Sequence, residues 1–382
     1  MDQPPLAATQ PTSPRQPGGS LVPALVYDGA IGELYSIFLL NILFTILTLG
    51  IWRFWAITRY RRYFWSHMRF QNERFEYTGT GGQLFVGFLL AGLIILGGEI
   101  VTGILAYICY LIYEPLFVLP IILAFLALLI LAFGAVFSAQ RYRISRTLWC
   151  GIRGGMTGSM ITYGVRSLLY TLLALGTLMQ MWPWAQIRLT ERRINASSFG
   201  NAQFSFHGRA GSVYLPYLLT FIGSAILFLV VGGALYLAFA PYLPVLMDTN
   251  PDTQMEKVQV VARLAWVIIL ADVALLVGLA LIQCWYAALF ERHVVGNTAI
   301  AGIPFRSSMS GPGLLGLIVG NLLIIVFTLG LGLPIVMHRN AQFLSRTLWM
   351  QGAIDRPALT QSTLTSSPYG EGMFQQLDAS TF

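Results

Sequence analysis

The stretch VYDGAIGELYSIFLLNILFTILTLGIWRFWAITRYRRYFW, residues Val26–Trp65, decides how this chain meets a membrane. It opens with a glycine-containing turn, continues through an apolar run and ends with several Arg residues among Tyr and Trp. Thr48-Leu49-Gly50 interrupts the apolar run, and Arg59 follows Thr48 by eleven residues. A helix disturbed at its middle either kinks and crosses the bilayer or turns back to the side on which it entered.

Two later segments repeat this arrangement. Thr177 precedes Arg188 by eleven residues, Thr328 precedes Arg339 by the same spacing, and Gly or Pro lies in between. A polar or aromatic residue lies seven positions before each Thr: Asn41, Tyr170 and Asn321. Its side chain would cap or bridge the broken helix, and an ordinary hydrogen bond between helices is the alternative. The repeat favours a re-entrant element, and an ordinary kinked span is the alternative.

The composition is that of an integral membrane protein. Of the 382 residues 56 % are hydrophobic and 10 % are charged, and the mean hydropathy is +0.67. Soluble domains carry about 25 % charged residues. The alternating pattern of a membrane β-barrel is absent. The net charge of +7 is read as positive-inside bias, because the Arg residues flank apolar runs, and no nucleic-acid partner is predicted.

The distribution of Arg favours four crossings rather than seven. If every apolar run crossed, the Arg-rich connectors after the third and fourth runs would face opposite compartments, against the positive-inside rule. If the first, fourth and seventh runs are re-entrant, every Arg-rich connector lies on the cytoplasmic side of the membrane. Both termini then lie on that side as well. The seven runs are Tyr35–Ile57, Leu84–Tyr110, Pro115–Phe137, Ser167–Ala185, Val213–Ala240, Val260–Leu289 and Leu314–Met337.

A second repeated motif, apolar-x-aromatic-x-Gly-x-x-Gly, indicates short strands between the runs. It occurs at Leu25–Gly32, Phe75–Gly82 and Phe204–Gly211. Alternation followed by Gly is typical of a strand that ends in a turn. The predicted fold class is an all-α polytopic membrane protein, a helical bundle with repeated broken or re-entrant segments and small cytoplasmic β-hairpins. Residues 25–356 form its single membrane domain, between disordered tails at 1–24 and 357–382.

Three segments carry a family resemblance: LLNILFTILTLGIWRFWAITRYRRYF at Leu39–Phe64, RFEYTG at Arg74–Gly79 and FSFHGRAG at Phe204–Gly211. They resemble the YjgN-like family of bacterial inner-membrane proteins, also known as domain of unknown function 898. The resemblance extends from about Leu25 to Asp355. It implies a multi-pass protein of the bacterial inner (cytoplasmic) membrane, and it carries over no catalytic residue.

Two acidic residues at membrane depth, Glu99 and Asp272, form the candidate intramembrane polar site. Because a charge at the bilayer centre costs about 2.5–3.5 kcal/mol on insertion scales, such residues are functional candidates. Together they would share a proton or bind a cation, and the alternative is a pair of structural contacts. Arg59, Arg61 and Arg62 are the candidate contacts for anionic lipid, with topological anchoring as the alternative.

The sequence lacks the motifs of several common kinds of enzyme and binding site. No nucleophile elbow, nucleotide fingerprint or metal-ligand spacing is present, and three Cys and four His residues are scattered. We therefore predict no enzyme, no metal and no cofactor. Transport or permeation of a small solute or ion is the leading hypothesis. A non-transporting scaffold or lipid-interacting protein is the alternative. The predicted partners are the lipid bilayer, including anionic lipids, an unknown solute or ion, and further copies of the chain in a homo-oligomer.

Overall fold

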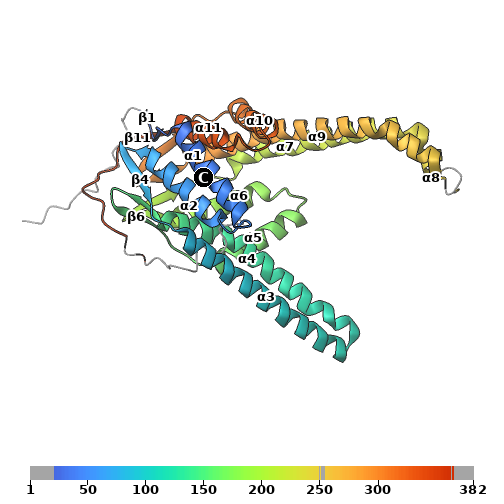
Figure 1. Ribbon diagram of the computed structural model, residues 1–382, viewed down its shortest axis with the longest axis horizontal. Coiled ribbons are helices and arrows are strands. Elements are labelled where there is room, and N and C mark those ends of the chain that lie inside the picture. The colour runs from blue at the N-terminus through green and yellow to red at the C-terminus, as the bar shows by residue number, and fades with distance from the viewer. Residues whose placement is uncertain (1–20, 249, 251–253, 363, 365–382) are drawn as a thin grey trace, which may run out of the picture.

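The computed structural model describes residues 21–248, 250, 254–362 and 364, and shows helix pairs that project from one antiparallel sheet (Figure 1). The strand order is β1-β11-β10-β9-β8-β7-β6-β5-β4-β3-β2. The strands are β1 Leu21–Pro23, β2 Leu25–Tyr27, β3 Met68–Phe70, β4 Glu73–Tyr77, β5 Thr147–Trp149, β6 Ile152–Met156, β7 Ser197–Phe199, β8 Ala202–Phe206, β9 Thr298–Ile300, β10 Ile303–Ser307 and β11 Leu348–Gln351.

The N-terminal strands join the two ends of this sheet. β1 and β2 are separated only by Ala24, yet β1 pairs with β11 and β2 pairs with β3. Ala24 is 1 % exposed, and its N–H donates a 3.0 Å hydrogen bond to the carbonyl oxygen of Leu348. The sheet is therefore a nearly closed ring, here called the sheet ring. Apolar side chains fill it, including Phe70, Trp149, Phe305 and Met350.

Four helices among the described residues are long and apolar enough to cross a membrane: Gly81–Ile112, Glu114–Ser145, Gly211–Met247 and Gln254–Gly296. They contain α3 Gly81–Ile112, η1 Glu114–Phe117, α4 Val118–Ser145, α7 Gly211–Phe239, η2 Ala240–Tyr242, α8 Leu243–Met247 and α9 Gln254–Gly296. The pairs α3/α4 and α7/α9 diverge as they leave the sheet ring (Figure 1). Their side chains are mostly exposed, which suits contact with lipid.

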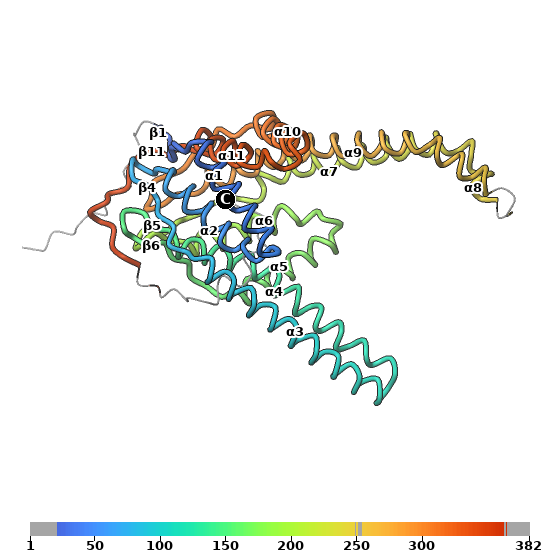
Figure 2. The backbone as a smooth tube through the Cα atoms, viewed as in Figure 1, coloured from blue at the N-terminus to red at the C-terminus, as the bar shows by residue number. Residues whose placement is uncertain are grey.

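Three shorter helix pairs alternate with the two long ones around the ring. They are α1 Ile31–Leu47 with α2 Arg53–His67, α5 Met160–Gly176 with α6 Trp182–Asn195, and α10 Gly311–Phe327 with α11 Leu333–Thr347. Each arm has 14 to 17 residues, fewer than the roughly 20 that a spanning helix needs. Helices of consecutive pairs are in contact, and α11 also packs against α1, which completes the circle (Figure 2).

Every helix pair begins and ends at two strands that pair with each other. β2 and β3 flank α1/α2, β6 and β7 flank α5/α6, and β10 and β11 flank α10/α11. Paired strands share one compartment, so each short pair returns to the membrane face on which it entered. The first, fourth and seventh apolar runs therefore fold as helix hairpins in this structure, as the predicted re-entrant elements require. That this face is the cytoplasmic one stays a prediction.

The tips of the short pairs share one turn. The hydroxyl of Thr48 accepts a hydrogen bond from the backbone N–H of Trp52 at 2.9 Å. The hydroxyls of Thr177 and Thr328 accept the equivalent bonds at 3.2 Å and 2.7 Å. In the first copy the N–H of Gly50 also donates to the carbonyl of Thr45, which closes α1 with a Schellman-type turn. Each Thr is thus the C-cap residue of one helix, and its hydroxyl binds the N–H of the residue just before the next helix, which explains why the repeat centres on Thr.

The residue after each Thr is a Leu with a left-handed backbone. Leu49, Leu178 and Leu329 all have φ of +50°, and their side chains are 95 %, 79 % and 92 % exposed. Glycine is the usual residue at this position of a helix C-terminus. An exposed leucine at each of the three tips indicates that the tips lie in the hydrocarbon of the membrane, because in water each would expose apolar surface to solvent.

The predicted all-α fold class is wrong, because the predicted small hairpins combine into one eleven-stranded ring. Each strand has three to five residues, so the sequence shows only local hairpins. The pairings that join them, such as Phe75 with Trp149, link residues far apart in the chain. The predicted spanning bundle is also wrong, since the two long pairs diverge instead of packing together (Figure 1).

Part of each expected tail is described by the structure. Leu21–Pro23 form β1. Near the C-terminus, the Asn201 side chain donates to the carbonyl of Ala358 and accepts from the N–H of Thr360, both at 3.1 Å. The chain after β11 therefore lies against the β7–β8 hairpin. The rest of the two expected tails, at residues 1–20, 363 and 365–382, lies outside the described residues.

Candidate functional site

The two intramembrane acids do not share a site. Glu99 lies on α3 and Asp272 on α9, which belong to the diverging long pairs (Figure 1). Both residues are exposed on their helices. Neither has a hydrogen bond or ion pair within residues 21–248, 250, 254–362 and 364. The structure therefore brings no cation or proton site together from this pair.

Of the three candidate lipid-contacting arginines of α2, one is buried and two are exposed. Arg61 is 3 % exposed and donates a 3.3 Å hydrogen bond to the hydroxyl of Tyr77. Arg59 and Arg62, which are exposed, lie three residues apart on the same side of the helix. Arg59 stacks over the ring of Trp52 at 5.0 Å, and Arg62 donates to the carbonyl of Gly79 at 2.9 Å. Arg61 is thus inside the protein, and only Arg59 and Arg62 remain available to lipid.

A larger basic site lies beside α5 and α6. It is a pocket of about 610 Å³, here called the α5–α6 pocket. Its charged residues are three arginines and one glutamate, and hydroxyl and amide groups complete its polar lining. These residues are Arg166, Arg188, Glu191, Arg192, Thr157, Ser159, Thr162, Tyr163, Tyr170 and Asn195.

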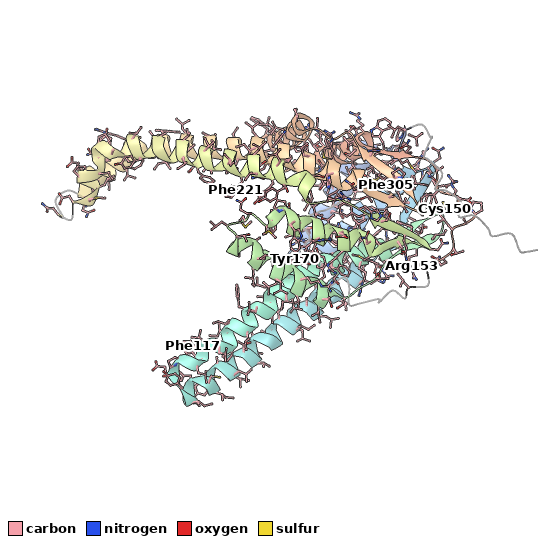
Figure 3. The ribbon with its side chains drawn as sticks, turned by 180° about the vertical axis from the view of Figure 1, so that it is seen from behind. Phe117, Cys150, Arg153, Tyr170, Phe221 and Phe305 are labelled. Carbon is pink, nitrogen blue, oxygen red and sulfur yellow. The ribbon has the colours of Figure 1, made fainter. Side chains whose placement is uncertain are left out.

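Helical spacing gathers these side chains from two antiparallel helices. On α5, Tyr163, Arg166 and Tyr170 recur at intervals of three and four residues and share one face. On α6, Arg188 and Arg192 lie four residues apart, and the rings of Tyr170 and Trp184 approach to 4.8 Å, which ties the two helices together. Figure 3 shows Tyr170 on the short pair, between the two long ones.

Two glycines set the wall of the pocket. A Cβ atom on Gly164 would lie 2.2 Å from the carbonyl oxygen of Ile130, so α5 packs on α4 at backbone distance. Gly158 has φ of +110° and turns the chain from β6 into α5. The Arg141 guanidinium donates to its carbonyl at 2.9 Å, which anchors this turn to α4. The pocket therefore lies where the helices meet the sheet ring.

The charges in the pocket are only partly neutralised. Arg188 forms a 2.9 Å ion pair with Glu191. The guanidinium groups of Arg166 and Arg192 have no hydrogen bond or ion pair to any residue that the structure describes. Guanidinium groups bind phosphate and carboxylate groups through paired hydrogen bonds. The arrangement is therefore suited to an anion.

Sequence reasoning did not identify this site. The sequence alone treats these arginines as charges that flank apolar runs. The signal was present, because Tyr-x-x-Arg-x-x-x-Tyr on one arm and Arg-x-x-x-Arg on the other are single-face patterns. Their convergence depends on the antiparallel packing of the two arms.

The interior of the sheet ring has a different character. It holds an apolar cavity of about 160 Å³ lined by side chains such as Phe75, Phe199 and Phe204. Ile354 and Leu359, from the chain after β11, pack onto the same cluster. Figure 3 shows Phe305 at this sheet end of the molecule, far from Phe117 at the distal end of α3/α4. Such a lining offers no partner to a polar solute or ion.

The residues described by the structure contain no group of three or more His, Cys, Asp or Glu side chains that could hold a metal ion. The four long apolar helices, the re-entrant pairs and the basic pocket define a multi-pass membrane protein.

The comparisons with known proteins give the family. The chain belongs to the family described as bacterial protein of unknown function (DUF898), whose model matches residues 23–376. It is 43 % identical over 70 residues to the inner membrane protein YjgN of Salmonella typhimurium, a match that covers 18 % of each chain. With the protein of the same name from Escherichia coli K12 it shares 38 % identity over 66 residues, 17 % of each chain.

These curated relatives are therefore matched over less than a fifth of their length. No solved structure matches the chain. The predicted family is confirmed, as is the location: this is a multi-pass protein of the bacterial inner membrane, embedded in lipid.

Proposed function

We propose that the protein binds anionic lipid headgroups in the α5–α6 pocket. The observation that carries this proposal is the convergence of Arg166, Arg188 and Arg192 on one pocket that contains a single carboxylate. The pocket lies at the base of helices whose outer surface is apolar. A lipid is the ligand that combines an anionic group with a need for such a surface.

The surroundings of the pocket fit both parts of a lipid. Arg166 and Arg192 supply charge without an internal partner, and the hydroxyls of Ser159 and Thr162 can donate to the remaining phosphate oxygens. On the same arm, Ile161 and Leu169 are 59 % and 56 % exposed and offer apolar surface to acyl chains. The α5/α6 pair therefore presents exposed apolar side chains beside a pocket that carries positive charge.

A lipid-retention measurement tests the proposal. The purified protein is examined by native mass spectrometry after extraction from membranes that contain anionic phospholipid. We expect Arg166→Gln with Arg192→Gln to weaken retention at least about tenfold, because each lost charged hydrogen bond contributes about 1.5–3 kcal/mol. The matched Lys double variant keeps the charge and is expected to give an intermediate loss.

Arg263→Gln is the control for charge alone, because Arg263 is exposed on α9, away from the pocket. It is expected to retain lipid as the wild type does. Equal retention by the wild type and the Gln double variant, with unchanged melting temperatures, would refute lipid binding in this pocket.

Transport of a small solute or ion is the other hypothesis from the sequence, and it has less support. Glu99 and Asp272 lie on diverging pairs, and apolar side chains fill the sheet ring. Flux in proteoliposomes compares the wild type with Asp272→Asn. A flux that depends on Asp272 would favour transport, and equal flux for the solutes tested would count against it.

A further inference from the structure

A second basic pocket lies between α7, α9 and β10. Its volume is about 420 Å³, and it is here called the α7–α9 pocket. Arg292 and His293 reach it from the last turns of α9, and Arg306 from β10. Ser212 and Ser307 add hydroxyl groups from the first turn of α7 and the end of β10.

The charge of this pocket is uncompensated. Its lining contains no carboxylate. Arg292 and Arg306 are exposed, and neither guanidinium group has a hydrogen bond or ion pair within the described part of the chain. The imidazole of His293 is already engaged, because Asn297 lies 3.3 Å from its Nδ1 atom and the Arg209 backbone also contacts the ring. The site therefore has two free guanidinium groups.

This pocket is built from other kinds of element than the α5–α6 pocket. The short pair α5/α6 supplies most of the lining of the first pocket, whereas the long helices α7 and α9 and strand β10 line the second. The residues also differ, because the second pocket lacks a counterpart of Glu191. The two pockets are therefore separate sites with different linings.

We propose that the α7–α9 pocket is a second anion site and binds a phosphate group through Arg292 and Arg306. Two guanidinium groups from separate elements can each present paired N–H donors to phosphate oxygens. The Ser212 and Ser307 hydroxyls complete the donor set. The same chemistry accepts a phosphate on a lipid headgroup or on a small soluble ester, and the experiment separates these two sources.

The experiment has a soluble arm and a lipid arm. In the soluble arm, protein in neutral detergent is titrated with inorganic phosphate and with glycerol 3-phosphate, and binding is measured calorimetrically. In the lipid arm, native mass spectrometry counts retained anionic phospholipids. Arg292→Gln with Arg306→Gln is compared with the wild type, with Arg263→Gln, and with the Arg166/Arg192 double variant of the other pocket.

If the ligand is soluble, the Arg292/Arg306 double variant is expected to bind phosphate or its ester at least about tenfold more weakly. If the ligand is a lipid, each double variant is expected to lose one retained lipid. A variant that carries all four substitutions, at Arg166, Arg192, Arg292 and Arg306, is then expected to lose two. Either result supports the site, and the Arg166/Arg192 variant shows whether the first pocket responds separately.

The proposal is overturned if the Arg292/Arg306 variant keeps its melting temperature and matches the wild type in both arms. Because both side chains are exposed, the variants are expected to fold. Single variants at Arg292 and at Arg306 provide the same comparison with half the charge change.

Discussion

At the scale of single residues, the tip leucines are the sharpest indication of where the protein meets lipid. A non-glycine residue at positive φ costs of order 1 kcal/mol or more, yet Leu takes this place in all three short pairs. Glycine would relieve the backbone strain but would remove the apolar side chain. The presence of Leu is explained if the tips lie in hydrocarbon.

Leu329→Asp tests this explanation. In water the change would be nearly neutral, because Asp tolerates a left-handed backbone and the side chain is 92 % exposed. In hydrocarbon the charge costs up to about 2.5–3.5 kcal/mol, so the yield of folded protein in membranes is expected to fall sharply. Ala301→Asp is the control, since Ala301 has φ of +49° in the exposed β9–β10 turn. Equal yields for both variants would place the tip in water.

The aromatic-x-Gly motif also has a physical reason at this scale. The ring of Tyr77 folds over Gly79, where an added Cβ would lie 2.6 Å from ring atoms. The same contact occurs between Tyr27 and Gly29, at 2.3 Å from the hydroxyl oxygen. Glycine is needed because the preceding aromatic ring occupies the space of its side chain.

Gly79→Ala is therefore expected to lower the free energy of unfolding by about 1–3 kcal/mol through overpacking against Tyr77. The control is Gly82→Ala, three residues further along, where no atom lies within 4 Å of the added Cβ. Thermal unfolding in nanodiscs provides the measurement. A loss at Gly82 as large as that at Gly79 would show that the Tyr77 ring is not the cause.

At the scale of elements, the repeated Thr spacing was enough to predict the three broken helix pairs. The predicted bridges between their arms are also present. Asn41 accepts a 3.2 Å hydrogen bond from the indole N–H of Trp52, and Asn321 donates a 2.7 Å bond to Asn340. These contacts are local in the chain, which explains why spacing alone could find them. The α5–α6 pocket was missed because it depends on how the two arms and α4 pack.

Thr328→Val probes the turn that these elements share. It removes the hydroxyl that accepts the N–H of Gly332 at the start of α11. Loss of a helix cap typically costs about 1 kcal/mol, so unfolding in nanodiscs is expected to occur at a lower temperature. Thr102→Val is the control, because that hydroxyl only donates to the carbonyl of Gly98 within α3. Equal shifts for both variants would contradict a capping role.

At the scale of the whole molecule, five helix pairs project from one sheet ring in the part of the chain that the structure describes. The sequence indicated the membrane class, the four long crossings and the short strands. It did not indicate the ring, because pairings such as Leu21 with Gln351 join opposite ends of the chain. It suggested a Glu99–Asp272 site because both residues are acidic and intramembrane. These two residues are separated because the long helix pairs diverge. No local sequence pattern predicts that divergence.

The ring requires all connectors between helix pairs to share one compartment, and this is the central claim. Labelling with a membrane-impermeant maleimide tests it in a background that retains one cysteine at a time. The two positions are Cys150, exposed between β5 and β6, and Gln203→Cys, exposed on β8. We predict that both react only in inverted vesicles. Reaction of Gln203→Cys from the outer face, with Cys150 reactive from the inner face, would contradict the ring and the re-entrant pairs together.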